Sequence, residues 1–99
     1  MNTVKQTDAF KNWLKNLKDI QAKAAIARRI KRLQGGLFGD CKSLGGGLFE
    51  MRIDTGKGWR VYYFQTGNTV YILIHGGNKS TQQADIATAR NIQQQIKGA

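Results

Sequence analysis

The stretch LFEMRIDTGKGWRVYYFQTGNTVYILIH, residues 48–75, decides the fold. It contains three strand-like runs rich in β-branched and aromatic residues, over Leu48–Asp54, Trp59–Gln65 and Val70–His75. The segments Thr55-Gly56-Lys57-Gly58 and Gly67-Asn68 separate them and are typical of turns. Because both connections are short, we expect the strands to pair as antiparallel neighbours. The third run is apolar at nearly every position, which indicates a central strand.

Helical patterns flank this stretch on both sides. Upstream, Thr7 can cap a first helix, and a second helix is expected to end at Gly35-Gly36. Downstream, Ser80 and Gln83 form the pattern of a capping box at the start of a last helix. Apolar residues recur at helical spacing in all three: Phe10, Trp13, Leu14 and Leu17; Ala22, Ile26, Ile30 and Leu33; Ile86, Ala89, Ile92 and Ile96.

A short strand around Thr3–Gln6 completes the expected order β-α-α-β-β-β-α, with an irregular, glycine-rich segment over residues 37–47. This order predicts an α+β fold. A helical hairpin should pack on one face of a mostly antiparallel sheet, followed by a C-terminal helix. A chain of 99 residues is expected to form one domain, residues 1–99.

The charge balance indicates an anionic partner. The chain has 16 Lys and Arg against 6 Asp and Glu, a formal net charge of +10. Such an excess on a short chain is typical of proteins that bind a polyanion, most often nucleic acid. A membrane surface is less favoured, because the basic residues are spread over several elements rather than one amphipathic helix. Simple solubility is the alternative explanation.

Other classes of protein are disfavoured. No run approaches the roughly 20 apolar residues that cross a bilayer, and Met1–Lys5 lacks the pattern of a signal peptide, so a cytoplasmic location is expected. The single cysteine, Cys41, has no Cys or His at metal-ligand spacing and is expected to be a buried or incidental thiol. We therefore expect no membrane partner, no metal and no cofactor.

A proposed strand register places the charges. If Ile53 lies opposite Trp59, Arg52 lies opposite Arg60, and Glu50 lies opposite Tyr62 in the neighbouring row. Setting Thr66 opposite Thr69 then pairs Tyr63 with Ile72, Val61 with Ile74, Tyr62 with Leu73 and Arg60 with His75. One row therefore reads Arg52, Arg60, His75, and Lys79 can join it from the loop that follows. Like charges opposite each other cost roughly 0.2–1 kcal/mol, and an anion bound on the row would reverse the sign of that cost.

Such a row suits phosphodiester chemistry on RNA, in which the 2′-hydroxyl attacks its own phosphorus. Arginine forks match the non-bridging oxygens, where negative charge gathers in the transition state. Glu50 is the candidate base, and His75 or Lys79 the candidate acid. Tyr62 or Trp59 can stack on a base. In the proposed register Trp59 falls on the core face with Tyr63, which favours packing for both. Because no carboxylate cluster suits a metal ion, we expect metal-independent cleavage.

Each of these residues also has a purely structural interpretation. Glu50 can be a surface ion-pair partner, and His75 can be structural at a strand end. Lys57, at a hairpin tip, is a solvated loop charge or a phosphate contact. The basic stripe of the second helix, which includes Arg28 and Arg32, is either a solvated face or a contact for nucleic acid or an antitoxin.

Four segments resemble a known family. They read, in order, FKNWLKNLKD, LFGDCKSLGGGLFEMRI, GWRVYY and GGNKSTQQADI, and together they cover nearly the whole chain. The chain resembles the addiction-module killer branch of the RelE/ParE toxin superfamily, close to HigB. The resemblance implies a RelE-like fold and a type II toxin–antitoxin pair, whose antitoxin is a helix-turn-helix, HigA-like protein. It also implies metal-independent cleavage of mRNA in the ribosomal A site.

The resemblance extends to individual residues. Arg60 corresponds to the family's strand arginine, Arg52 to the basic residue of the preceding strand, and Lys79 to the basic residue after the last strand. Glu50 resembles a carboxylate that serves as base in some members. A tyrosine that several members use in the C-terminal segment is absent, and Asp85 lies near its place.

The leading hypothesis is therefore a ribosome-dependent mRNA endonuclease that acts as a toxin, with an antitoxin, the ribosome and mRNA as partners. A second hypothesis is a ParE-like poison of DNA gyrase, which shares the fold but needs no cationic row. A third is a non-catalytic nucleic-acid-binding module.

Overall fold

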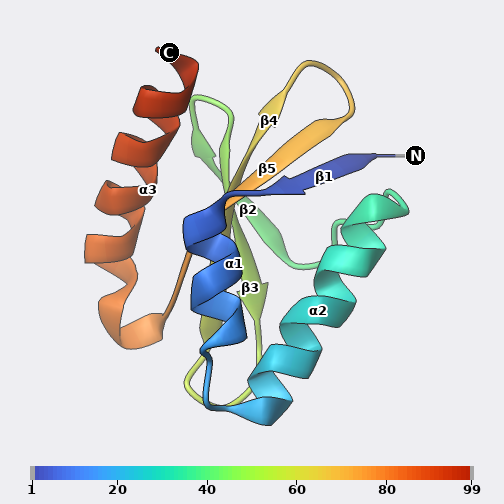
Figure 1. Cartoon of the computed structure of the whole chain (residues 1–99), viewed down its shortest axis with the longest axis vertical. Coiled ribbons are helices and arrows are strands. Elements are labelled where there is room, and N and C mark those ends of the chain that lie inside the picture. Colours follow the sequence, from blue (N-terminus) through green and yellow to red (C-terminus); the bar gives the residue numbers. More distant parts are fainter. Residues whose placement is uncertain (1, 99) are drawn as a thin grey trace.

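The computed structural model describes residues 2–98 and has the expected α+β architecture (Figure 1). A sheet of five strands has the order β1-β5-β4-β3-β2. β1 and β5 are parallel, and the other neighbours are antiparallel. In chain order the elements are β1 (Thr3–Gln6), α1 (Asp8–Lys15), α2 (Ile20–Gln34), β2 (Cys41–Gly45), β3 (Leu48–Ile53), β4 (Trp59–Thr66), β5 (Val70–Asn78), a 3₁₀ turn η1 (Lys79–Thr81) and α3 (Gln82–Lys97).

Local capping explains where the first two helices begin and end. The hydroxyl of Thr7 accepts a hydrogen bond from the backbone N–H of Phe10 at 3.1 Å, as the sequence predicted. A carboxylate oxygen of Asp19 accepts one from the N–H of Ala22 at 3.0 Å and begins α2. Gly35 caps the end of α2, also as predicted.

Helices cover both faces of the sheet, and each face has its own apolar core (Figure 1). The larger core packs α1 and α2 against one face, with Phe10, Ile26 and Leu33 fully buried. The smaller core packs α3 against the other face around Ala89. Because neighbouring residues of a strand point to opposite faces, Tyr62 and Tyr63 belong to different cores. Inner strands such as β4 and β5 are therefore apolar on both faces, as predicted for the third run.

Residues 37–47 were expected to be irregular, and this prediction was wrong for Cys41–Gly45, which forms β2. β2 pairs antiparallel with β3 and supplies partners for the outer backbone groups of that strand. The turn between them passes through glycines with positive φ, from Gly45 to Gly47. The glycines that indicated a loop therefore allow a tight hairpin.

The predicted register between β3 and β4 is confirmed, including Arg52 opposite Arg60 and Glu50 opposite Tyr62. The predicted register between β4 and β5 was wrong. A longer turn puts Thr66 opposite Val70, and a β-bulge shifts the pairing again between Tyr62 and Tyr63.

The shift changes every pair of β4 and β5 that the sequence interpretation proposed. The observed pairs are Tyr63 with Leu73, Tyr62 with His75, Val61 with Gly76 and Arg60 with Gly77. β5 also continues to Asn78 rather than ending at His75.

The last helix also begins differently from the prediction. The capping box is formed by Asn78 and Thr81 around η1, rather than by Ser80 and Gln83. α3 proper starts at Gln82. Within residues 2–98 no helix combines the length and apolar character needed to cross a bilayer.

Candidate functional site

A cationic cleft of about 400 Å³ lies where β3, β4 and the end of β5 meet. It brings together Arg52, Arg60 and Lys79, the three cations that the sequence predicted for the site. Arg52 and Arg60 lie opposite each other in the β3–β4 ladder, and Lys79 opens the turn after β5. The remaining lining residues are Asp40, Ile53, Asp54 and Gly58.

Gly58 fits closely between two of these cations. Its carbonyl oxygen accepts a hydrogen bond from Nη1 of Arg60 at 2.7 Å. A Cβ at this position would lie 3.2 Å from Nη1 of Arg60 and 3.4 Å from Cβ of Lys79. Its φ of +73° also favours glycine. Gly58 therefore lets Arg60 and Lys79 lie close to the same turn.

A buried carboxylate lies behind Arg60. Glu50 is only 1% exposed, and its Oε2 accepts hydrogen bonds from Nε2 of Gln82 at 2.8 Å and from the hydroxyl of Tyr62 at 3.2 Å. Its Oε1 lies 4.0 Å from Nε of Arg60, a buried nitrogen that has no hydrogen-bond partner in the described part of the chain. Glu50 therefore offers a compensating charge beneath Arg60, and as placed it is not accessible to a substrate.

Tyr62 is likewise fully buried, so its ring offers no surface for a nucleobase to stack on. Burial raises the pKa of the Tyr62 hydroxyl, and the charge of the neighbouring Glu50 raises it further. The hydroxyl therefore stays protonated and donates to Glu50. Trp59, the other candidate for stacking, is also buried and packs against Trp13.

Arg52 is held at the mouth of the cleft by Asp40. Oδ1 of Asp40 accepts hydrogen bonds from Nη2 of Arg52 at 2.7 Å and from Nε at 3.1 Å. The hydrogen bond to Asp40 and its negative charge raise the pKa of Arg52. Both side chains are well exposed, 41% for Arg52 and 56% for Asp40. A phosphate can therefore approach Arg52 from solvent.

Arg29 fixes the loop that carries Asp40. From α2 it donates to the carbonyl oxygens of Arg52 at 2.6 Å, Phe38 at 3.1 Å and Asp40 at 3.2 Å. Gly39 lies against its guanidinium, and a Cβ there would be 2.8 Å from Nη2. The sequence interpretation counted Arg29 only in the basic stripe of the second helix and assigned no role to Asp40 or Gln82. The partners of all three lie far along the chain.

His75 is not in the row of arginines, so the predicted row Arg52, Arg60, His75 is wrong in its third member. The β-bulge places His75 opposite Tyr62, with the ring centroids 6.1 Å apart, and Gly77 takes the position opposite Arg60. Nε2 of His75 lies 2.9 Å from Oδ1 of Asp85 in α3. His75 therefore links β5 to α3.

The other predicted RNA contacts border two hollows that adjoin the cleft. Lys57 and Lys79 line a hollow of about 490 Å³. Lys79 also lines the cleft, so the hollow and the cleft adjoin. Arg28 and Arg32 line a polar hollow of about 300 Å³ on the other side, which shares Ile53 and Asp54 with the cleft. The cationic surface therefore runs from α2 across the cleft to the turn that contains Lys57.

Within residues 2–98, His, Cys, Asp and Glu form no group of three or more that could hold a metal ion. The cations of the cleft can bind an oxyanion and stabilise negative charge that develops on it.

The fold and the cleft together define a small, basic α+β protein with a cleft lined by three cations. Residues 12–97 match the family described as "Phage derived protein Gp49-like (DUF891)". The chain belongs to this family, which is a toxin-like, RelE-type family of toxin–antitoxin systems. It is also 50% identical over 93 residues to an "Uncharacterized protein" of Haemophilus influenzae, covering 94% of each chain. No solved structure matches the chain significantly.

Proposed function

We propose that this protein is the toxin of a type II toxin–antitoxin module, of the HigB-like branch, and that it cleaves mRNA on the ribosome. The observation that carries this proposal is the convergence of Arg52, Arg60 and Lys79 in one cleft, with the buried Glu50 behind Arg60. A protein that poisons DNA gyrase needs no such convergence.

In the proposed reaction the 2′-hydroxyl oxygen bonds to the adjacent phosphorus as its proton passes to a solvent water, and the bond from phosphorus to the 5′-oxygen breaks. The products are a 2′,3′-cyclic phosphate and a 5′-hydroxyl. Arg60 and Arg52 bind the non-bridging oxygens, where negative charge increases in the transition state. Lys79 gives a proton to the leaving 5′-oxygen. The proposed step uses no metal ion.

In the proposed reaction, electrostatic stabilisation of the transition state contributes more to the rate than acid–base catalysis does. Glu50 is buried and His75 is engaged with Asp85, so neither stands in the cleft as a ready base. We therefore assign Glu50 to positioning Arg60 and His75 to holding α3. The scarcity of acid–base groups supports dependence on the ribosome, which would orient the 2′-hydroxyl for attack.

The partners follow from the same surface. Lys57, Arg28 and Arg32, which border the adjoining hollows, would contact RNA phosphates on either side of the cleft. Membership in a toxin-like family supports a cognate antitoxin, and the proposed branch implies a helix-turn-helix, HigA-like protein. The proposed place of action is the cytoplasm.

The direct test is Arg60→Ala, assayed on mRNA in translating ribosomes and for toxicity in cells. Loss of one preorganised donor to a developing oxyanion typically lowers kcat about 10²–10³-fold, and we expect a loss of that size. Lys11→Ala, which removes an exposed cation from α1, is the charge-matched control and should be active.

Three results would contradict the proposal in different ways. Undiminished mRNA cleavage by Arg60→Ala would show that the site is wrong. Wild-type toxicity with DNA breaks and intact mRNA would indicate the gyrase hypothesis. RNA binding without cleavage or toxicity would indicate a non-catalytic module.

A further inference from the structure

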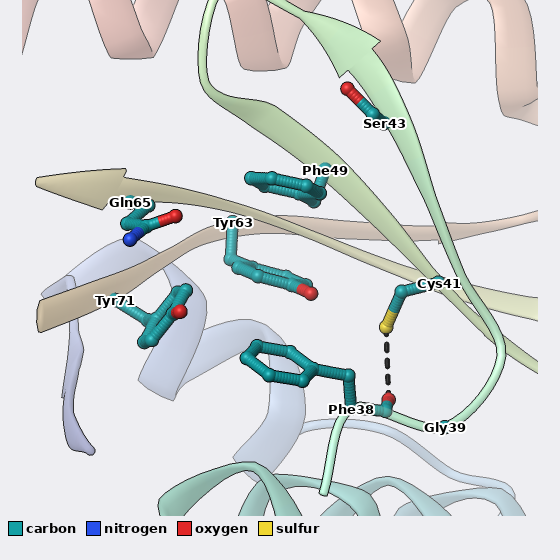
Figure 2. A pocket seen from close by; sticks show the side chains of 8 residues that line it. All are labelled: Phe38, Gly39, Cys41, Ser43, Phe49, Tyr63, Gln65 and Tyr71. Carbon is teal, nitrogen blue, oxygen red and sulfur yellow. Dashed lines mark hydrogen bonds between the residues drawn. The ribbon is translucent and has the colours of Figure 1, made fainter. Parts of the chain in front are cut away.

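Another hollow, lined by aromatic rings, lies on the sheet face that carries Phe49 and Tyr63, and it extends from β5 to the edge strand β2 (Figure 2). Its volume is about 410 Å³. The lining residues are Phe38, Gly39, Cys41, Ser43, Phe49, Tyr63, Gln65 and Tyr71, of which none is charged and none belongs to α1 or α2. Phe49 stacks on Tyr63 at 5.4 Å, and Tyr71 meets Tyr63 edge to face at 5.8 Å. Helices α1 and α2 therefore leave this part of the apolar sheet face uncovered.

The wall of this aromatic pocket is preformed and apolar. Phe38 meets Tyr71 edge to face at 5.6 Å yet remains 40% exposed, and Leu37 beside it is 66% exposed. The carbonyl oxygen of Phe38 accepts hydrogen bonds from Arg29 and from the thiol of Cys41. Figure 2 shows the Phe38 ring facing the rings of Tyr63 and Tyr71 across the hollow. Exposed apolar side chains held rigidly around a pocket are typical of a contact surface.

The pocket lies directly beside an unpaired strand edge. β2 ends the sheet, and the N–H of Arg52 donates to the carbonyl of Asp40. In an antiparallel pair, alternate residues direct their backbone N–H and C=O groups toward the neighbouring strand. Asp40 does so toward β3, and therefore the backbone groups of Cys41 and Ser43 point away from β3. The side chains of the same two residues line the pocket. A strand added to β2 would therefore place alternate side chains next to the pocket.

Charge selects among possible occupants. The chain carries a net +10, and Lys42 lies exposed on β2 itself. Arg90 of α3 donates to the carbonyl of Leu44 at the same strand. Two copies of this chain would repel each other here, whereas an acidic segment would be attracted. An RNA base would find rings but no cation among the lining residues.

We propose that the β2 edge and the aromatic pocket form one docking surface for an acidic polypeptide, which adds a strand to β2 and inserts an apolar side chain into the pocket. The proposal rests on the proposed function in one respect, since it takes that polypeptide to be the antitoxin.

The test measures the affinity of the full-length protein for the purified product of the adjoining reading frame by calorimetry. Phe38→Asp puts a charge at the pocket wall, and Ser43→Pro removes an outward N–H without breaking a bond to β3. Each has a matched control: Ile20→Asp changes an exposed apolar residue at the start of α2, and Ser43→Ala keeps the N–H. Circular dichroism verifies folding, and cleavage of mRNA on ribosomes is measured in parallel.

We expect the partner to bind at least tenfold more weakly to Phe38→Asp and Ser43→Pro, and with wild-type affinity to both controls. Cleavage should be retained by all four variants. If Ser43→Pro does not fold, Phe38→Asp and Ile20→Asp decide the question. Loss of cleavage by the wild-type protein would defeat the proposed function and leave the docking result standing.

Three outcomes would overturn the docking proposal. In the first, the partner binds Phe38→Asp and folded Ser43→Pro as tightly as wild type. In the second, the wild-type protein does not bind the product of the adjoining frame. In the third, the variants lose affinity for single-stranded RNA instead of for the partner, which would assign the pocket to a nucleobase.

Discussion

Glu50 is a charged side chain whose surroundings decide its role. The β3–β4 register places it in the row next to the paired arginines, but α3 closes over it and Gln82 and Tyr62 satisfy its Oε2. A buried carboxylate held by two donors favours a cation nearby. Arg60, with Nε 4.0 Å from Oε1, is that cation. Arg60 lines the cleft, whereas Glu50 lies behind Arg60 and does not line it.

The positioning role of Glu50 predicts a mild effect of Glu50→Gln on cleavage. Loss of a general base typically costs about 10²–10⁴-fold, whereas we expect a loss below about tenfold, because glutamine keeps an acceptor for Tyr62 and Gln82. Single-turnover cleavage on programmed ribosomes measures the effect. If Glu50→Gln slowed cleavage as much as Arg60→Ala does, Glu50 would act as the general base and the positioning role would be wrong.

The raised pKa of Tyr62 predicts that the free energy of unfolding depends on pH in the alkaline range. Its folded pKa is raised above the ordinary 10.0, so the unfolded chain releases this proton at a lower pH than the folded protein does. The stabilisation is therefore complete below pH 10 and is lost as the pH rises further. The free energy of unfolding in urea should fall less steeply above pH 10 for Tyr62→Phe than for the wild type. Equal slopes for the two proteins would contradict the buried hydroxyl.

At the scale of elements, the contact between β5 and α3 depends on a glycine. Gly77 lies so close to Asp85 that a Cβ would sit 1.8 Å from its Oδ2. Asp85 in turn binds His75, and its Oδ2 accepts a hydrogen bond from the hydroxyl of Thr81 at 2.5 Å. α3 is thereby held by polar contacts at its first turn, in addition to its thin apolar stripe.

Gly77→Ala should displace the start of α3 and destabilise the protein by about 1–3 kcal/mol, the usual cost of overpacking. Urea unfolding measures it, with Gly35→Ala as the control, because a Cβ there would be 3.4 Å from its nearest neighbour. Adding Asp85→Ala should restore part of the lost stability by removing the clash. No cost for Gly77→Ala would contradict the close packing of α3.

The accuracy of sequence reasoning differed between neighbouring strand pairs for a physical reason. β3 alternates clearly and is followed by a short turn, so Ile53 opposite Trp59 could be predicted. β4 and β5 are buried on both faces, so alternation gave no register, and the bulge at Tyr62 left no sequence signal. The site was affected accordingly: the Arg52–Arg60 pair was predicted, whereas His75 was misplaced and the burial of Glu50 was missed.

At the scale of the whole molecule, the cations form a path rather than a single point. The cleft shares lining residues with one hollow at Arg28 and Arg32 and with another at Lys57. The aromatic pocket has no lining residue in common with this path, although Gly39 and Cys41 of the pocket flank Asp40 of the cleft in the chain. The two surfaces can therefore serve two different partners.

The path predicts how RNA affinity responds to salt. Each phosphate contact on a single strand contributes about −0.7 to the slope of log K against log salt, so Arg28→Ala with Arg32→Ala should make the slope shallower by about 1.4. Binding of a single-stranded RNA oligonucleotide between about 50 and 200 mM salt measures it. Lys11→Ala with Lys15→Ala, on α1, is the control. An unchanged slope for the arginine pair would indicate a merely solvated helix face.

The most direct test of the central claim compares one labelled mRNA free in solution and programmed into translating ribosomes, each incubated with the wild-type protein. The proposed function predicts rapid cutting only on the ribosome, with fragments that end in a 2′,3′-cyclic phosphate and a 5′-hydroxyl. It also predicts that Arg60→Ala cuts about 10²–10³-fold more slowly. Efficient cutting of free RNA would contradict ribosome dependence, and intact mRNA on the ribosome would contradict the endonuclease itself.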